Sequence, residues 1–221
     1  MRKIIMWIVA ILNAAGAAVL LALRPENRVP VHYGLDGLPD RWGSKWELLL
    51  LPLVPVLLAA GFELYWRLTR TNGKLLKNRK LEEKFASYVQ VAFAAVSWVT
   101  LAGVLRGRLE TDEIPIGWIF IAVGLLIMLV GNMMGKLEQN RAFGIRTKWT
   151  LENKEVWRRT HRFCGQVWAV CGLLLMADGA AGLVFSLPLA AVSAVFIALF
   201  LVIALTPFLY SWRAYKKAGA P

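Results

Sequence analysis

Long uninterrupted runs of apolar residues dominate this chain of 221 residues. A helix of about 20 residues crosses the hydrocarbon core of a bilayer, which is about 30 Å thick. Most of the runs reach that length, and few strongly polar side chains interrupt them. We therefore expect six transmembrane helices, at about residues 4–23, 46–66, 85–105, 116–135, 163–177 and 183–209.

The last two apolar runs differ from the others in length. The fifth is the shortest, and it crosses the membrane comfortably only if its helix begins before Phe163, within residues 157–162. Pro188 and Pro207 lie near the ends of the sixth run, where a proline costs a helix least. Between the two runs we expect a tight turn around residues 177–182.

Composition supports a membrane protein. Hydrophobic residues make up 58% of the chain and charged residues 18%, against about 45–50% and about 25% in soluble domains. This content excludes intrinsic disorder. Arg2 and Lys3 precede the first run as in a secretory signal, but the run is longer than the apolar stretch of about 7–15 residues in such signals. We expect it to be retained, with a cleaved signal as the alternative.

The net charge of +12 would suggest nucleic-acid binding in a soluble protein. Its distribution favours another interpretation. With the N-terminus in the cytoplasm, 20 of the Lys and Arg residues lie on the cytoplasmic side and 6 on the other. Such a bias in short loops sets the orientation of a membrane protein. We therefore predict an all-α integral membrane protein, a six-transmembrane-helix bundle with both termini inside (N-in/C-in).

Two loops contain most of the remaining information, and they divide the chain. Residues 24–45 form an outer loop within an N-terminal membrane half, residues 1–115, which holds the first three spans. Residues 136–162 form a cytoplasmic loop within a C-terminal membrane half, residues 116–221, which holds the last three.

The cytoplasmic loop is too rich in aromatic and aliphatic side chains for a disordered linker. Gly144 suits a turn, and Thr150 or Asn153 can cap a following helix. On that helix one face carries residues at spacings of four, three, four and three, namely Trp157, His161, Cys164, Trp168 and Cys171. Arg158 and Arg162 form a cationic strip beside this face.

Two interpretations of this helix remain open. It is either a docking or gating surface that joins the cytoplasm to the fifth span, or an amphipathic helix at the membrane interface. In the second case the Trp side chains lie at headgroup depth and the Arg side chains on anionic lipid. The spacing alone favours the interfacial helix.

Catalytic and metal chemistry find little support. His161 and Cys164 are spaced for a shared metal, but structural zinc needs four ligands, and the other histidine, His32, lies on the opposite side of the membrane in the predicted topology. The motifs HExxH, GxSxG and GxxxxGK[ST] are absent from the sequence. We therefore expect no metal site, no cofactor and no enzymatic activity.

The outer loop also allows two readings. His32, Asp36 and Asp40 could hold a cation or contact an extracellular ligand. Turn formation by the Asp residues is favoured, with Trp42 and Trp46 as anchors at the membrane interface.

Polar residues inside the spans are costly and therefore deserve a functional hypothesis. Glu63 lies four residues before Arg67, so an ion pair at the cytoplasmic edge explains it. Asn132 lies between Gly131 and Gly135, a spacing that allows a neighbouring helix to approach closely. We expect Gln90 and Gln166 to hydrogen-bond across helices. The other polar positions are Asn13, Ser97, Thr100 and Asp178, and none is a carboxylate near the midplane, which argues against an ion pump.

Both loops resemble a known family. The C-terminal half resembles the SdpI family of bacterial membrane proteins at Gly131, Asn132, Gly135, Lys136, Leu137, Asn140, Phe143, Gly144, Ile145, Arg146, Thr147, Trp149, Thr150, Leu151, Asn153, Val156, Trp157, Thr160, His161 and Gly165. Lys148 stands where the family usually has proline. The outer loop, at residues 29–33, 37 and 39–45, resembles the small domain of unknown function that often precedes that family.

The resemblance implies a multi-pass protein of the bacterial cytoplasmic membrane that gives immunity to a secreted membrane-active peptide, the sporulation-delaying-protein toxin. It also implies signalling, in which a small transcriptional repressor is held at the membrane when toxin is present. The family has no established catalytic residues. The implied partners are membrane lipids, an extracellular peptide toxin and a cytoplasmic repressor protein, without direct contact to nucleic acid.

Residue roles follow as hypotheses. We expect the toxin to meet His32, Asp36, Asp40, Arg41 and Trp42. We expect signalling through Asn140, Gly144, Arg146, Trp149, Trp157, Arg158 and His161. Helix packing is expected at Gly131, Asn132, Gly135 and Gln166. The alternative is a small membrane transporter or lipid-handling protein with Asn132, Gln166 and His161 around a cytoplasmic vestibule; a membrane enzyme with His161 as base is a third possibility.

Overall fold

Six long helices form the protein, which is described here from a computed structural model covering residues 2–34, 38–71, 76–106 and 116–219. All six are long and apolar enough to cross a membrane. This confirms the all-α bundle of six spanning helices. They are α1 (Arg2–Leu23), α2 (Leu50–Leu68), α4 (Arg79–Arg106), α5 (Ile116–Met134), α7 (Lys154–Phe185) and α8 (Leu189–Lys217).

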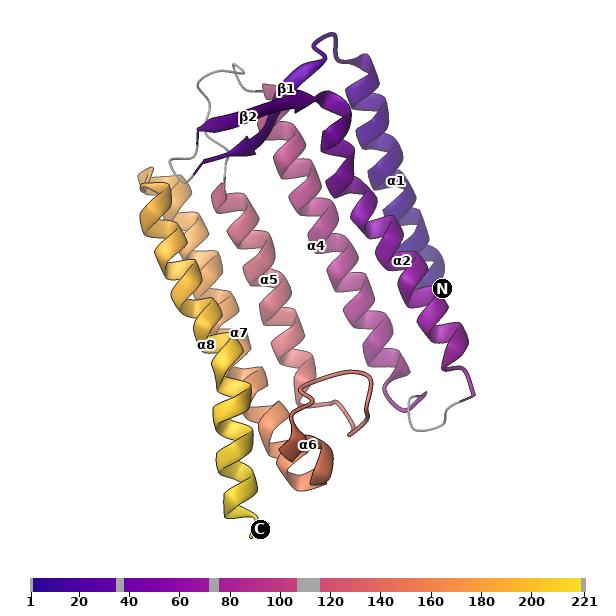
Figure 1. The fold of residues 1–221 in the computed structure, drawn as a ribbon, viewed down its shortest axis with the longest axis vertical. Coiled ribbons are helices and arrows are strands. Elements are labelled where there is room, and N and C mark those ends of the chain that lie inside the picture. The colour runs from indigo at the N-terminus through magenta and orange to yellow at the C-terminus, as the bar shows by residue number, and fades with distance from the viewer. Residues whose placement is uncertain (1, 35–37, 72–75, 107–115, 220–221) are drawn as a thin grey trace.

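Short elements lie at the two ends of the bundle (Figure 1). At one end, β1 (Arg28–Tyr33) and β2 (Pro39–Ser44) form an antiparallel hairpin, followed by a 3-10 helix, η1 (Lys45–Leu49). The short helix α6 (Lys148–Glu152) lies at the opposite end. We call residues 28–44 the outer hairpin and residues 135–153 the inner segment, after the predicted orientation.

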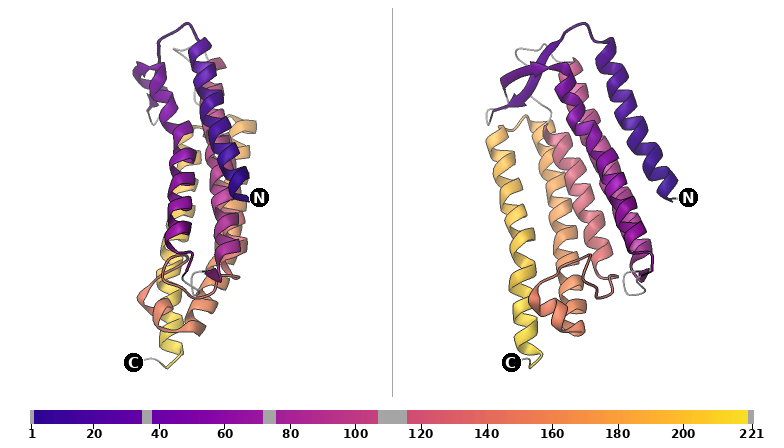
Figure 2. Two further views of the ribbon diagram at one scale, coloured as in Figure 1. Left: turned by 90° about the vertical axis from the view of Figure 1, so that its right-hand side faces the viewer. Right: turned by 45° about the vertical axis from the view of Figure 1, so that its right-hand side comes forward.

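The helices pack in two groups. In the first, α1, α2 and α4 contact one another, and in the second α7 contacts both α5 and α8. Packing of α4 against α5 joins the groups. Turned edge-on in Figure 2, the bundle is much narrower than in Figure 1. The division of the chain into two halves at residue 115 stays a prediction.

The fifth and sixth helices differ in extent from the prediction. Helix α7 begins at Lys154, before Phe163 as required, but it continues for 32 residues to Phe185. The turn expected at residues 177–182 is therefore wrong. Instead the chain turns at Ser186, whose φ of 49° is left-handed, and Pro188 is the N-cap residue of α8. Because α8 extends to Lys217, Pro207 lies inside this helix rather than near its end.

Glycines bring α5 and α7 into close contact. A Cβ added to Gly124 would lie 2.6 Å from the carbonyl oxygen of Gly172, which is too close for any side chain. Three such pairs occur, seven residues apart on each helix: Gly117 with Gly179, Gly124 with Gly172, and Gly131 with Gly165. A seven-residue repeat keeps the same faces of two helices together along their length, and small residues allow the backbones to approach.

This contact confirms one predicted packing residue and corrects the others. Gly131 lies at the close approach, whereas the atom nearest to a Cβ on Gly135 is Cα of Arg162, at an ordinary 3.8 Å. The glycines that allow the close approach of α5 and α7 are therefore spaced seven residues apart, and not four as in the pair Gly131 and Gly135. Asn132 and Gln166 are exposed on the helix surfaces rather than between helices.

Two amides inside the spans hold the first group of helices together. Asn13 on α1 donates a 3.0 Å hydrogen bond to the carbonyl oxygen of Pro52, and Gln90 on α4 donates a 2.8 Å bond to that of Pro55. Both amides are buried. Gln90 therefore hydrogen-bonds across helices as expected, but its partner is the backbone of α2 and not Gln166. The expected pair of Glu63 with Arg67 is confirmed at 3.0 Å.

Candidate functional site

The inner segment is built on Asn140, which is buried. Its Oδ1 accepts hydrogen bonds from the backbone N–H groups of Ala142 and Phe143, at 2.8 and 2.7 Å. Its Nδ2 donates to the carbonyl oxygens of Glu138 and Phe143, at 2.9 and 3.0 Å. An amide side chain offers two donor hydrogens and an acceptor oxygen, so Asn140 uses its full capacity to fix this turn.

Gly144 follows at a position that only glycine occupies easily. Its φ of 111° lies in the region disfavoured for other residues. A Cβ there would also lie 2.6 Å from Nε2 of His161. Glycine therefore permits both the turn and the close approach of the backbone to the imidazole ring.

His161 is held at both ring nitrogens. The backbone N–H of Ile145 donates to Nε2 at 2.9 Å, so Nε2 carries no hydrogen. Nδ1 lies 2.9 Å from the carbonyl oxygen of Trp157, which can only accept, so Nδ1 carries the hydrogen. The side chain is only 1% exposed. This neutral imidazole has no free nitrogen to act as a base or to bind a metal.

Trp157 forms the other half of this buried pair. Its ring stacks on His161 with centroids 3.9 Å apart, and its Nε1 donates to the carbonyl oxygen of Leu137 at 2.8 Å. The predicted shared face of α7 is confirmed, because Cys164 and Cys171 are buried along it. The face packs inside the protein, however, so Trp157 is buried against protein and does not contact lipid headgroups.

Hydroxyl groups tie the inner segment to α8. Thr147 caps α6 by accepting from the N–H of Thr150, and its hydroxyl donates to Oγ of Ser211 at 3.0 Å. Tyr215 donates to the carboxylate of Glu152 at 2.7 Å. Asn153 caps α7, as predicted. Sequence reasoning missed Ser211 and Tyr215, because nothing local in α8 distinguishes them from other polar residues near a helix end.

A further contact reaches across to the first group of helices. Buried Asn78 donates to the carbonyl oxygen of Glu138 at 2.8 Å and accepts from the N–H of the same residue at 2.9 Å. The ring of Phe143 meets the edge of Phe85 on α4, with centroids 5.0 Å apart. The inner segment thus contacts α4 on one side and α8 on the other.

The predicted signalling residues therefore separate into two sets. Asn140, Gly144, Trp157 and His161 come together and hold the fold of the inner segment. The remaining predicted residues, Arg146, Trp149 and Arg158, are exposed or half-buried. Arg146 donates to the carbonyl oxygen of Arg141 at 2.9 Å, and Arg158 forms a 2.8 Å ion pair with Glu155. Only this second set offers side chains to another molecule.

The outer hairpin brings three of the predicted toxin-facing residues to the surface. Nδ1 of His32 lies 2.6 Å from Oδ1 of Asp40, and both side chains are exposed. Arg41 pairs with Glu47 at 3.4 Å, and Trp42 is half-buried. Asp36 lies outside the described residues. In the part of the chain that the structure describes, three or more His, Cys, Asp or Glu residues nowhere gather as a metal site would require.

Buried Lys45 fastens the hairpin to the bundle. Its Nζ donates a 2.5 Å hydrogen bond to the carbonyl oxygen of Arg24, at the end of α1. Ser44 and Glu47 form a capping box that starts η1 and leads into α2. The hairpin is therefore a folded unit with a defined position on the helix ends.

Comparisons with known proteins agree with this division of features. Residues 136–211 match the model of the SdpI/YfhL protein family, and residues 4–55 match a domain of unknown function, DUF1648. Among curated proteins, the Immunity protein SdpI of Bacillus subtilis (strain 168) is 27% identical over 174 residues, which cover 79% of each chain. No solved structure matches.

The two matches coincide with the two ends of the bundle that carry the candidate residues. The DUF1648 match includes α1 and the outer hairpin, and the SdpI/YfhL match includes most of the inner segment, α7 and most of α8. The resemblance seen in the sequence is confirmed. With its six apolar helices, the protein is a multi-pass protein of the bacterial cytoplasmic membrane in which residues 4–55 resemble DUF1648 and residues 136–211 resemble the SdpI/YfhL family.

Proposed function

We propose that this protein is an immunity protein that protects its host bacterium from a secreted, membrane-active peptide toxin. The observation that carries the proposal is the similarity to the Immunity protein SdpI over 79% of both chains. Protection of this kind needs binding and no turnover. Both ring nitrogens of His161 are engaged, so this residue is not available as a catalytic base.

The outer hairpin is the part of the chain that would meet the toxin. In the predicted orientation it faces the outside, where a secreted peptide arrives. His32, Asp40 and Arg41 present charged and polar groups there, with Trp42 beside them. Of these residues, arginine and tryptophan belong to the types enriched at protein interfaces.

The inner segment is the part that would meet a cytoplasmic partner. We propose that Arg146, Trp149 and Arg158 contact a small transcriptional repressor, which is held at the membrane when toxin is bound outside. The contacts of the inner segment with both α4 and α8 support this role, because a movement between the two helix groups would alter its surface. Two sites and two states are what allosteric coupling requires.

A survival assay tests the protective role. A toxin-sensitive bacterium expressing this protein should survive a dose of the sporulation-delaying-protein toxin that kills the same strain without it. The variant H32A/D40A/R41A should lower survival at least about tenfold at equal expression, because it removes polar contacts from the hairpin surface. The matched control is K148A, an exposed change at the opposite end. The proposal would be contradicted if the same toxin dose killed cells that express the wild-type protein and cells that lack it.

Signalling is tested by a separate readout. Charge reversal in R146E/R158E should abolish capture of the repressor at the membrane and leave survival unchanged, since both side chains are exposed and lie at the inner end. The variant K217E, an exposed charge reversal at the inner end outside the proposed surface, serves as the control and should retain capture. Equal capture by wild type and R146E/R158E would contradict the assigned surface.

The alternative function, a transporter or lipid-handling protein, is predicted to use a vestibule lined by Asn132, Gln166 and His161. Asn132 and Gln166 are exposed on helix surfaces, whereas His161 is buried with both ring nitrogens bonded. These three residues therefore do not line a common vestibule.

A further inference from the structure

A cavity of 330 Å³ lies where α2, α4 and the inner segment meet. Leu57, Gly61 and Phe62 of α2 form its apolar wall, and Phe143 closes the end towards the inner segment. Tyr65 and Glu82 supply its polar groups. The volume lies in the range of pockets that bind small ligands, about 300–1,000 Å³.

The cavity opens towards lipid and not towards the protein interior. Leu57 is 71% exposed on α2, and Gly61 is exposed beside it. A Cβ added at Gly61 would meet no atom within 4 Å, so the space in front of this glycine is empty. An occupant can therefore enter sideways from the bilayer.

The polar residues of the cavity lie near the membrane boundary, and its apolar residues lie deeper in the membrane. Tyr65 lies three residues before the end of α2, and Glu82 lies in the first turn of α4, so both are close to the membrane boundary. Leu57 lies eight residues deeper than Tyr65 along α2, about 12 Å at 1.5 Å per residue. The polar end is thus at headgroup level and the apolar end in the hydrocarbon.

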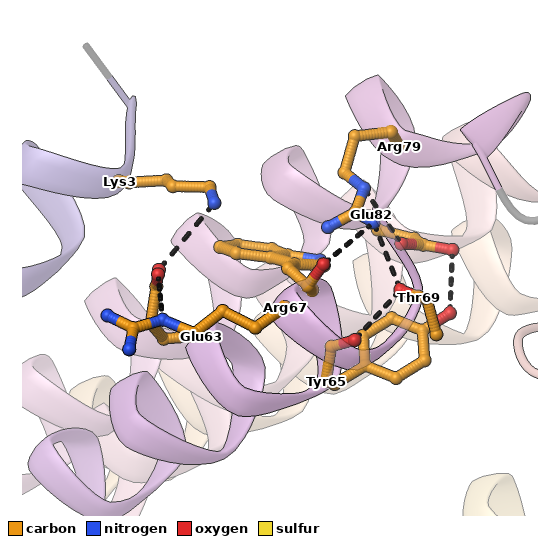
Figure 3. A network of polar contacts seen from close by, with 8 residues as sticks. Lys3, Glu63, Tyr65, Arg67, Thr69, Arg79 and Glu82 are labelled. Carbon is orange, nitrogen blue, oxygen red and sulfur yellow. Dashed lines mark hydrogen bonds and ion pairs between the residues drawn. The ribbon is translucent and has the colours of Figure 1, made fainter. Parts of the chain in front are cut away.

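The carboxylate at the polar end is incompletely bonded. Glu82 is only 2% exposed, and its Oε1 accepts a 3.2 Å hydrogen bond from the hydroxyl of Tyr65. Its Oε2 accepts no hydrogen bond, and it forms an ion pair with Nε of Arg79 at 3.9 Å. Figure 3 shows that the guanidinium of Arg79 also donates to Thr69, at 3.0 Å. Buried carboxylate oxygens are costly without donors, so this end of the cavity favours an occupant that donates hydrogen bonds.

We propose that this cavity binds a membrane phospholipid with an ammonium headgroup, of the phosphatidylethanolamine class. One acyl chain fills the apolar part beside Gly61, and the ammonium group donates to the pair of Tyr65 and Glu82. The lateral opening, the match of polarity to depth and the acceptor at headgroup level all fit a lipid of the bilayer. The lipid is a resident ligand that braces α2 against Phe143, and the proposal does not depend on the immunity function.

Lipid binding to the purified full chain tests the proposal. Delipidated protein in detergent is mixed with phosphatidylethanolamine or with phosphatidylcholine of the same acyl chains, which lacks a donor on its headgroup. Phosphatidylethanolamine at saturation should raise Tm by about 5 °C more than phosphatidylcholine, because a ligand of the folded state stabilises it. Native mass spectrometry should show one retained phosphatidylethanolamine molecule.

Two variants locate the site. G61L fills the empty space and should remove both the retained lipid and the extra rise in Tm. A60L introduces the same side chain at an exposed neighbouring position outside the cavity and should behave as wild type. E82Q should reduce the difference between the two lipids.

Equal effects of the two lipids on the wild type would overturn the proposal, as would undiminished lipid binding by G61L. If E82Q does not fold, G61L and A60L still decide the question. The survival assay can fail or succeed without changing this result, so the two proposals are judged separately.

Discussion

At the scale of single residues, polar side chains near the inner end of the bundle mainly position backbone. In the sequence, His161 was open to interpretation as a base, a metal ligand or a signalling contact. The structure shows both of its nitrogens bonded to backbone groups of Ile145 and Trp157. Gly144 makes this possible, because it has no side chain and lets the backbone approach Nε2 of the ring.

Replacement of His161 by alanine should destabilise the inner segment. The N–H of Ile145 would be left buried without a partner, which costs about 1–3 kcal/mol, and the stacking with Trp157 would be lost. We expect a lower Tm and faster proteolysis within residues 135–153, measured on the full chain in detergent. Exposed Arg162 gives the control, since R162A should leave both values unchanged. A Tm of H161A equal to that of wild type would refute the structural role.

Long-range polar contacts could not be predicted from the sequence at this scale. Asn78 bonds to Glu138, 60 residues away, and Thr147 bonds to Ser211, 64 residues away. Local patterns did predict the cap at Asn153 and the pair of Glu63 with Arg67, because each involves neighbours within a helical turn. A hydrogen bond is visible in a sequence only when both partners lie within reach along the chain.

At the scale of elements, the backbones of α5 and α7 approach each other closely at their glycines. These glycines repeat every seven residues on both helices. The interval of four residues that drew attention to Gly131 and Gly135 missed this repeat. Comparison of the two helices at an interval of seven would have detected it, since the signal is present in the sequence.

Alanine at Gly124 should separate these helices and destabilise the protein. The new Cβ would meet the carbonyl oxygen of Gly172 at 2.6 Å, a backbone atom that cannot move aside alone. We expect a loss of about 1–3 kcal/mol, as for other overpacked sites, read as a lower Tm. The matched control is G61A, also inside a spanning helix, where nothing lies within 4 Å. Because alanine favours helix, G61A should equal or exceed the stability of wild type; similar losses in both variants would contradict this packing.

At the scale of the whole molecule, the orientation in the membrane is a prediction from charge. Most Lys and Arg residues lie at the end of the bundle that carries α6, while the outer hairpin lies at the other end. The bias predicts that α6 and both termini are cytoplasmic. The toxin-binding role proposed for the outer hairpin and the repressor-binding role proposed for the inner segment both depend on this orientation across the membrane.

Cysteine labelling of intact cells tests the orientation. The native Cys164 and Cys171 are buried, so they should react little with a maleimide that does not cross membranes. R41C should be labelled in intact cells, whereas R146C should be labelled only after permeabilisation, because both positions are exposed at opposite ends. The reverse pattern would invert the topology and exchange the proposed toxin and repressor surfaces.

The number of spans, their approximate positions and the family resemblance could be predicted from the sequence, because membrane insertion depends on local apolar runs and the resemblance on local motifs. Which polar residues are available to partners depends on how the helices pack in the folded protein. The packing buries Trp157 and His161, exposes Asn132 and Gln166, and forms the cavity beside Gly61. Burial depends on which helices pack together, and that packing is set by contacts between residues far apart in the chain.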